Sequence, residues 1–237
     1  KEAPPELFRK RTVMDFEFAR LEHPGSKIVR LNTGSMTPRY IREVLPNLPD
    51  PGDMEYRTFM RCAKAENKAL AKVLEQKGAA FPPLTMGIGV EFPSNRMLAY
   101  MDKGISTEDI LETLHICARH KVAVNGNIIL GWGNLVETDL QDLADFLDRV
   151  PARSMASVQL RWLYAHPHTP IHEQYQGAPI YLGPFYLGFK VEIPQAQQAL
   201  NQEAVRLIEA FSSAKGVRIE GLGNVRQNPG DGGHATN

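Results

Sequence analysis

The chain has 237 residues, of which 43% are hydrophobic, and its 27 basic residues balance 27 acidic ones. This length and composition suffice for a sizeable core in one domain or two small ones. The balanced charge offers no basic field for nucleic acid, and no apolar run reaches the ~18 residues of a membrane span, so we expect neither a nucleic-acid partner nor a membrane anchor.

The cysteines and the start of the chain bear on where the protein works. Only Cys62 and Cys117 are present, which is too few for a disulfide framework and typical of a reducing compartment. Their separation matches no local metal motif, and the apolar neighbours of Cys117 indicate a buried thiol. The first residues, KEAPPELFRKR, are charged and proline-rich, unlike a signal peptide. We therefore expect a cytoplasmic protein.

Helix and strand patterns alternate along the first third of the chain. Prolines before an apolar stripe favour an opening helix, and Thr37 with Pro38 marks a second helix start. In chain order, the patterns predict a helix from Pro4 to about Leu21, a strand at Lys27–Leu31, a helix from Thr37 to about Leu45 and a long Ala- and Lys-rich helix over Tyr56–Gln76.

The rest of the chain continues this alternation. Ser106, with Asp109 three residues later, indicates a capped helix start, and a stripe of leucines from Leu140 predicts a helix that Pro151 ends. A loop rich in Pro, Gly, His and Tyr is predicted from Tyr164 to about Ile193. The expected strands are Leu84–Phe92, Val122–Leu130, Ser157–Leu163 and Val217–Gly221, with a last helix over Gln195–Ala214.

This alternation predicts an α/β fold of parallel βα units with helices on the outside. A closed barrel needs eight strands in ~200–250 residues, whereas the patterns here give four or five. We therefore expect part of an open (β/α) TIM-like barrel. The strands that begin near Lys27, Leu84, Val122 and Ser157 should be parallel neighbours in chain order.

In such folds the functional side chains gather at the carboxyl ends of the strands. Glu91 is the sharpest candidate, because it ends an apolar strand after two glycines that permit close approach of a ligand. Its carboxylate could accept hydrogen bonds from a ligand amine or ribose hydroxyls; a capping or salt-bridged glutamate is the alternative. Asn125 and Asn127 lie on one side of the next strand, where they face either a polar ligand or solvent.

Two further strand ends carry weaker signals. The turn Gly131–Gly133 contains an aromatic residue but indicates little alone. The histidines of the following loop lack the further ligands of a zinc site, so a substrate-contacting or solvated loop is preferred and no metal ligand is predicted. The candidate substrate contacts after the last strand of this series are Arg161, Tyr164, His166 and His168.

Five short motifs follow one another between Gly87 and Asp139. They are Gly89-Val90-Glu91 at a strand end, Ser94 to Leu98, Met101-Asp102-Lys103-Gly104, Ile129-Leu130-Gly131-Trp132 at the next strand end, and a helix start at Glu137-Thr138-Asp139. In order and spacing this stretch resembles radical SAM enzymes, in particular the oxygen-independent coproporphyrinogen oxidases and the cobalamin-binding methyltransferases. The resemblance covers roughly Lys27 to Tyr175. The segment His168–Glu173 is similar to a Pro-Gly-Thr-Pro turn of that family, with His168 where Gly is usual.

The resemblance implies a partial (β/α) barrel that binds S-adenosylmethionine (SAM) across its strand ends. By motif position, Glu91 would hold the ribose or methionine part of SAM, Lys103 would approach its carboxylate, and Asn127 would contact the ribose. Arg30 and Asn32 fall on the preceding SAM-lining strand. An acidic residue is frequent there in the family, so Arg30 departs from the pattern.

The large departure from the family is the cluster loop. Radical SAM enzymes hold a 4Fe–4S cluster with three cysteines in a C-x-x-x-C-x-x-C loop, and two distant cysteines cannot supply it. We therefore expect the cluster ligands to lie upstream of Lys1 or on another polypeptide, unless the protein has lost the chemistry.

Two functions stay open from the sequence. In the first, the chain is part of a radical SAM enzyme that, with the cluster supplied, forms a 5′-deoxyadenosyl radical or supports a cobalamin-assisted methyl transfer. Its partners would then be a small-molecule or peptide substrate, an electron donor and the N-terminal half of the same enzyme. In the second, it is a non-catalytic half-barrel that acts as a binding or scaffold subunit.

The same analysis predicts how the chain is organised. We expect an N-terminal helix and linker over 1–26, the barrel part over 27–175, and a C-terminal loop, helix and strand over 176–227. Residues 228–237 form a polar, Gly-rich tail that is predicted to be disordered.

Overall fold

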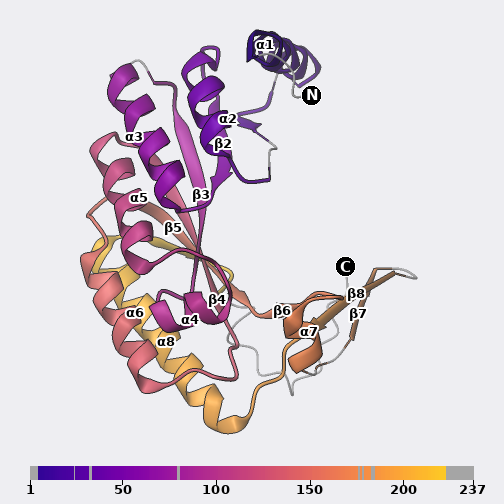
Figure 1. Cartoon of the computed structure of the whole chain (residues 1–237), viewed down its shortest axis with the longest axis vertical. Helices are drawn as coiled ribbons and strands as arrows, with labels where there is room; N and C mark the ends of the chain where they lie inside the picture. The colour runs from indigo at the N-terminus through magenta and orange to yellow at the C-terminus, as the bar shows by residue number, and fades with distance from the viewer. Residues whose placement is uncertain are drawn as a thin grey trace. The chain divides into compact units, whose positions relative to one another are not determined.

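The computed structural model describes residues 5–23, 25–31, 34–78, 81–175, 177, 179–182 and 185–222. Its main feature is a six-stranded parallel sheet with the order β1-β2-β3-β4-β5-β9 (Figure 1). Among the described residues the sheet stays open, with β1 and β9 at its edges. The strands are β1 (Ile28–Arg30), β2 (Glu55–Met60), β3 (Leu84–Glu91), β4 (Ala123–Leu130), β5 (Met155–Trp162) and β9 (Arg218–Glu220). This confirms the predicted α/β fold of parallel βα units in an open sheet.

Most of the helices begin and end where the sequence predicts. Thr37 caps α2 by accepting a hydrogen bond from the Tyr40 N–H, and Ser106 and Asp109 form the predicted capping box of α5. Gly216 ends α8 in the left-handed conformation that favours glycine. The helices are α1 (Pro5–Glu22), α2 (Pro38–Glu43), the 3-10 turn η1 (Leu45–Asn47), α3 (Lys64–Lys77), α4 (Asn95–Tyr100), α5 (Thr107–Arg119), α6 (Glu137–Arg149), α7 (Pro170–Gln174) and α8 (Gln195–Lys215).

The predicted helix over Tyr56–Gln76 is wrong in its first part. Residues Glu55–Met60 form β2, which pairs in parallel with β1 and β3. Tyr56, Thr58 and Met60 are buried in alternation with more exposed neighbours, which is the period of a strand rather than a helix. The predicted neighbours β1 and β3 are therefore separated by β2, and the sheet has six strands instead of four or five.

The predicted loop from Tyr164 to Ile193 also contains regular structure. It forms β6 (Tyr164–Ala165), α7, β7 (Pro179–Leu182) and β8 (Phe185–Lys190). The three strands pair in antiparallel fashion in the order β6-β8-β7. In Figure 1 the short α7 lies beside these strands, and the His172 ring nitrogen Nε2 lies 2.9 Å from the Tyr186 hydroxyl.

The chain divides into two compact units, and the boundary between them crosses β3, β4 and β5. The first contains Lys1–Gly89, Gly104–Gly126 and Val150–Ala156, and the second contains Val90–Lys103, Asn127–Arg149 and Ser157–Asn237. The carboxyl ends of β3, β4 and β5 therefore belong to the second unit. We describe the candidate site within that unit.

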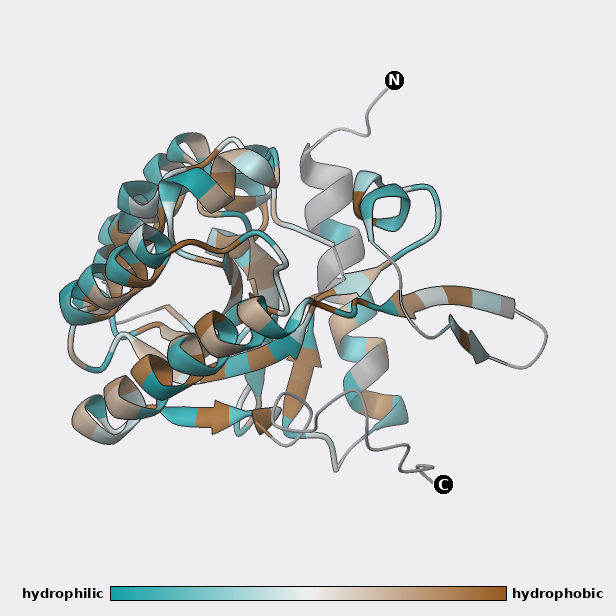
Figure 2. Ribbon diagram, turned by 90° about the horizontal axis from the view of Figure 1, so that it is seen from below, coloured by the Kyte–Doolittle hydropathy of each residue, from teal (hydrophilic) through white to brown (hydrophobic). Residues whose placement is uncertain are grey.

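Strand β4 has one fully buried face and one half-buried face. In β4, Val124, Ile128 and Leu130 are buried, whereas Asn125 and Asn127 on the other face keep part of their surface exposed. The helices are likewise divided into hydrophilic and hydrophobic stretches (Figure 2). Among the described residues, no helix combines the length and apolarity that a membrane crossing requires.

Candidate functional site

Glu91, the last residue of β3, pairs with Lys103. Lys103 donates a hydrogen bond from Nζ to Glu91 Oε1 at 2.9 Å, and the Glu91 side chain keeps 15% of its surface exposed. The backbone of Glu91 has a φ of 63°, a region that residues other than glycine rarely adopt and that is enriched at functional sites. The structure therefore brings together two of the predicted SAM-binding residues, and their ion pair is also the salt-bridged form of Glu91 that the sequence left open as the alternative.

The segment between these two residues runs through α4 and brings Lys103 back beside Glu91. Val90 and Phe92 are fully buried around Glu91, and α4 follows after a short turn. The Lys103 N–H then donates to the Leu98 carbonyl at 3.1 Å, which closes the last turn of the segment. Lys103 therefore lies beside Glu91, which is twelve positions earlier in the sequence.

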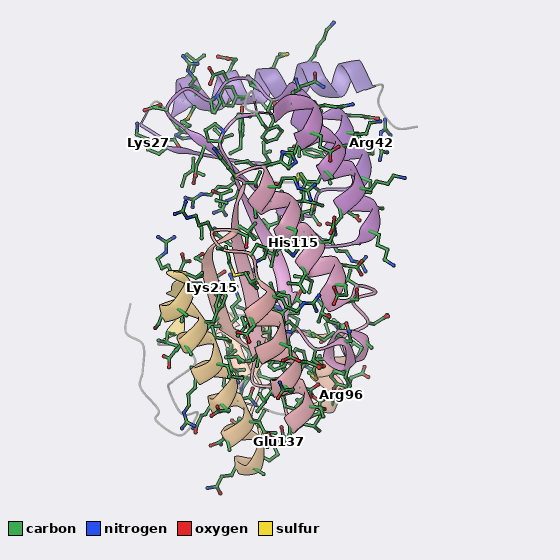
Figure 3. All side chains as sticks on the ribbon, turned by 90° about the vertical axis from the view of Figure 1, so that its left-hand side faces the viewer. Lys27, Arg42, Arg96, His115, Glu137 and Lys215 are labelled. Carbon is green, nitrogen blue, oxygen red and sulfur yellow. The ribbon has the colours of Figure 1, made fainter. Side chains whose placement is uncertain are left out.

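A buried carboxylate anchors the beginning of the same segment. Asp139, in the first turn of α6, is 1% exposed. Its Oδ1 accepts hydrogen bonds from Ser94 Oγ at 2.6 Å and from Arg96 Nε at 3.0 Å, and its Oδ2 accepts from the Val136 N–H at 2.9 Å. Arg96 also forms an ion pair with Oδ2 through Nη2; Figure 3 labels Arg96 and Glu137, the first residue of α6.

The surroundings of Asp139 keep it ionised. Burial acts to raise the pKa of Asp139, but hydrogen bonds from Arg96, Ser94 and the Val136 N–H outweigh burial and lower that pKa below its ordinary value. The hydrogen bond to Asp139 correspondingly raises the pKa of Arg96. These contacts explain why Ser94 and Asp139 belong to the motifs of the sequence, although neither was a predicted site residue.

Asn127 lies on the half-buried face of β4, three residues before that strand ends. Its side-chain amide has no hydrogen-bond partner within the part of the chain that the structure describes, and no hydrogen bond links it to Glu91 or Lys103. An amide in this state has donors and an acceptor available for a polar ligand.

The turn Gly131–Gly133 after β4 is held by a residue from α8. The side-chain oxygen of Asn201 accepts from the Gly131 N–H at 2.6 Å, and its amide donates to the Trp132 carbonyl at 3.0 Å. Asn201 and Trp132 are both 2% exposed. The sequence carries no signal for this role of Asn201, because it lies 70 residues from Gly131.

The predicted substrate contacts lie at the end of β5 and in the segment that follows it. Arg161 is exposed and donates to the Gln159 side chain at 2.9 Å. The rings of Tyr164 and His166 are 4.8 Å apart, and the Tyr164 hydroxyl is buried without a hydrogen-bond partner among the described residues. His168 has a φ of 63°, a backbone region that favours glycine.

The other two predicted SAM contacts lie outside the described residues of the second unit. Arg30 ends β1 with an exposed side chain and belongs to the first unit. Asn32 lies outside the described residues, as does the predicted tail over 228–237. The placement of both SAM contacts against a ligand therefore stays a prediction.

Both cysteines are fully buried thiols, and neither forms a disulfide. Burial raises the pKa of Cys117 to about 12, whereas a cluster ligand must be a thiolate. Within the described residues, no group of three or more His, Cys, Asp or Glu side chains is placed to hold a metal ion.

We expect anaerobic reconstitution of this 237-residue chain with iron and sulfide to yield no 4Fe–4S cluster, because one cluster needs three accessible thiolates and the sequence has two cysteines. The measurement is the iron content per chain together with the visible absorption spectrum. About four irons per chain with a brown colour would show that Cys62 and Cys117 are ligands.

Comparisons with known proteins find similarity to solved structures alone. No protein-family model matches it, and no curated protein matches it. The solved structures that it resembles include TsrM from Kitasatospora setae, a radical S-adenosylmethionine methyltransferase with cobalamin and a 4Fe–4S cluster bound (16% identity, TM-score 0.49, 72% of this chain and 32% of that one). They also include coproporphyrinogen III oxidase (HemN) from Escherichia coli, a radical SAM enzyme (14% identity, TM-score 0.48, 88% and 46%).

A third similar structure is the archaeal Elp3 of Methanocaldococcus infernus (13% identity, TM-score 0.48, 92% of this chain and 54% of that one). The chain thus spans between about a third and about half of the length of these proteins.

Proposed function

We propose that this chain is the part of a radical SAM enzyme that binds the ribose and methionine portion of S-adenosylmethionine. The observation that carries the proposal is the Glu91–Lys103 pair at the carboxyl end of β3. Both residues occupy motif positions of the resemblance, and strand ends of this kind bind ligands in parallel α/β folds. Because the chain spans only part of the similar structures, the activity of the whole enzyme is part of the same proposal.

The side chains of the second unit fit SAM in charge and hydrogen-bonding capacity. SAM carries an ammonium group, a carboxylate and ribose hydroxyls. Glu91 can accept hydrogen bonds from the ammonium group or a hydroxyl, Lys103 can pair with the carboxylate, and the Asn127 amide can both donate and accept. Since the Lys103 side chain is 39% exposed, exchanging its contact with Glu91 for contacts to SAM costs little.

For the 4Fe–4S cluster the described residues do not fit, because the two buried cysteines cannot supply three thiolates. We therefore propose that residues outside this chain hold the cluster, and that this chain orients SAM and excludes water. Radical formation or cobalamin-assisted methyl transfer would then be a property of the assembled enzyme.

The substrate side of the proposal rests on the end of β5 and the segment that follows it. We propose Arg161, Tyr164, His166 and His168 as contacts to a small-molecule or peptide substrate, with an electron donor as a further partner in the cytoplasm. The unpartnered Tyr164 hydroxyl supports this, because a buried hydroxyl without a hydrogen bond is unfavourable.

Replacing Glu91 by alanine in the enzyme that contains this chain is expected to weaken SAM binding by roughly 10- to 150-fold, which corresponds to the 1.5–3 kcal/mol of a hydrogen bond to a charged group. Glu91→Gln keeps an acceptor and should lose less. Lys103→Ala should also weaken binding, but by less, because its amine is partly solvated. The measurement is calorimetric titration with SAM.

Glu203→Ala is the matched control, because Glu203 forms an exposed ion pair with Arg206 at 2.8 Å and should leave SAM affinity unchanged. Circular dichroism checks that each variant is folded. If Glu91→Ala binds SAM with the affinity of the parent, Glu91 is a structural strand-end residue. If Glu91→Ala does not fold, a structural salt bridge of Glu91 is favoured. Parental affinity in every site variant would support the scaffold alternative.

A further inference from the structure

The Asp139 network and the Glu91–Lys103 pair hold the same short segment from two sides. Ser94 and Arg96, which Asp139 binds, come three and five residues after Glu91. Arg96 Nη2 also donates to the Asn134 carbonyl at 2.7 Å, so Arg96 joins the start of α4 both to α6 and to the loop before it. The segment from Glu91 to Lys103 is therefore fixed to α6 at its beginning.

The strained backbone of Glu91 makes this fixation relevant to the site. With a φ of 63°, Glu91 holds a conformation that costs free energy and persists only where neighbouring contacts enforce it. Asp102, next to Lys103, has a φ of 50° and likewise holds a backbone conformation that costs free energy. The hydrogen bonds of Ser94 and Arg96 to one carboxylate are the polar contacts nearest in sequence to Glu91 that tie the segment to another helix.

We infer that Asp139 is a positioning residue, which sets the direction of the Glu91 and Lys103 side chains toward SAM without touching it. The inference rests on the proposed function. Asp139 is 1% exposed and both of its oxygens are occupied by Ser94, Arg96 and the Val136 N–H. It therefore has no capacity left for a ligand, and it acts on the site through the start of α4.

The test is a double-mutant cycle on SAM affinity in the holoenzyme that contains this chain. Asp139→Asn keeps the size of the side chain but removes the charge that Arg96 pairs with, so SAM binding should weaken by roughly 2- to 30-fold, the range for mutations coupled to a site. In the Glu91→Ala background the same change should have a clearly smaller effect, because only the Lys103 contact is then left to be misplaced. Non-additivity of this kind is expected where two residues act through one another.

The outcomes separate the inference from the proposed function. If Glu91→Ala binds SAM like the parent, the proposed function fails. If Glu91→Ala weakens binding but Asp139→Asn does not, or if Asp139→Asn weakens it equally in both backgrounds, the positioning role is wrong. A purely structural role would lower the melting temperature and leave the affinity of the folded protein unchanged.

Two further variants keep the test decisive. Asp145→Asn changes an exposed carboxylate on the same helix, whose contact is Gln141 at 3.0 Å, and should alter neither affinity nor the cycle. If Asp139→Asn does not fold, Ser94→Ala removes one hydrogen bond of 2.6 Å to the same carboxylate and replaces it in the cycle. The same non-additivity with Glu91→Ala is expected, and additivity would overturn the inference.

Discussion

Replacing Arg96 by alanine is expected to lower the free energy of unfolding by about 3 kcal/mol. The change leaves the Asp139 carboxylate, which is 1% exposed, without its counter-ion, and removing one partner of a buried ion pair costs about 3–5 kcal/mol. We expect the lower end of this range because Ser94 and the Val136 N–H still donate to Asp139. Chemical denaturation with urea measures the change.

The matched control is Arg206→Ala, which breaks an exposed pair with Glu203 at 2.8 Å. Exposed pairs contribute about 0–1 kcal/mol, so this variant should unfold close to the parent. Equal losses in the two variants would show that the environment of Asp139 does not distinguish its ion pair from a surface contact.

When the pH is lowered, the Arg96→Ala variant should unfold at a higher pH than the parent. In the parent, the pKa of Asp139 is lowered in the folded state, so its contribution to stability is present above the unfolded value and is lost as pH falls through the folded pKa. Without Arg96, burial raises that pKa again, and the loss begins at a higher pH. Acid titration followed by circular dichroism tests the shift.

The sequence predicts the regular parts of this fold because local patterns and tertiary packing agree there. In β3 an apolar run ends at Glu91 and Pro93, and in α5 the cap at Ser106 precedes a buried apolar stripe. Both elements could be placed without knowing their neighbours. The order of β3, β4 and β5 in the sheet then follows from the tendency of consecutive βα units to lie side by side.

The errors occur where local composition and tertiary packing disagree. The alternation of Tyr56, Thr58 and Met60 marks β2, but the Ala- and Lys-rich run that follows has the stronger pattern and extended the predicted helix backward. Between β6 and β8, prolines and glycines indicate a loop. The strands there form through pairing such as Tyr164 with Lys190, which no local pattern contains.

The candidate site divides in the same way. Glu91 and Lys103 could each be predicted as candidates because each lies in a motif of the resemblance, whereas their pairing at 2.9 Å is seen only in the structure. Asp139 and Asn201 could not be assigned roles, since their partners lie 45 and 70 residues away in the sequence. Contacts between residues so far apart in the sequence depend on how α6 and α8 pack, which local sequence patterns do not reveal.

Gly131→Ala is expected to destabilise the protein by about 2–5 kcal/mol. Gly131 has a φ of 89°, and a Cβ placed on it would lie 2.5 Å from the Trp162 ring. The left-handed backbone costs an alanine roughly 1–2 kcal/mol, and forcing a methyl group into a filled space costs about 1–3 kcal/mol more. The ring cannot easily retreat, because Trp162 Nε1 donates to the Val191 carbonyl at 2.7 Å and Lys190 Nζ lies 5.3 Å from the ring centroid.

A variant at Gly216 separates the cost of the left-handed backbone from the cost of the clash with Trp162. Gly216 has a φ of 67°, but no described atom lies within 4 Å of the position that an alanine methyl group would take there, so Gly216→Ala should show the backbone cost alone, roughly 1–2 kcal/mol. Adding Trp162→Leu should bring the cost of Gly131→Ala down to that of Gly216→Ala, because the clashing ring is gone. Thermal and urea unfolding of the four variants give these differences. If Gly131→Ala costs no more than Gly216→Ala while Trp162 is present, the ring does not pack against the end of β4, and the close contact at this strand end is wrong.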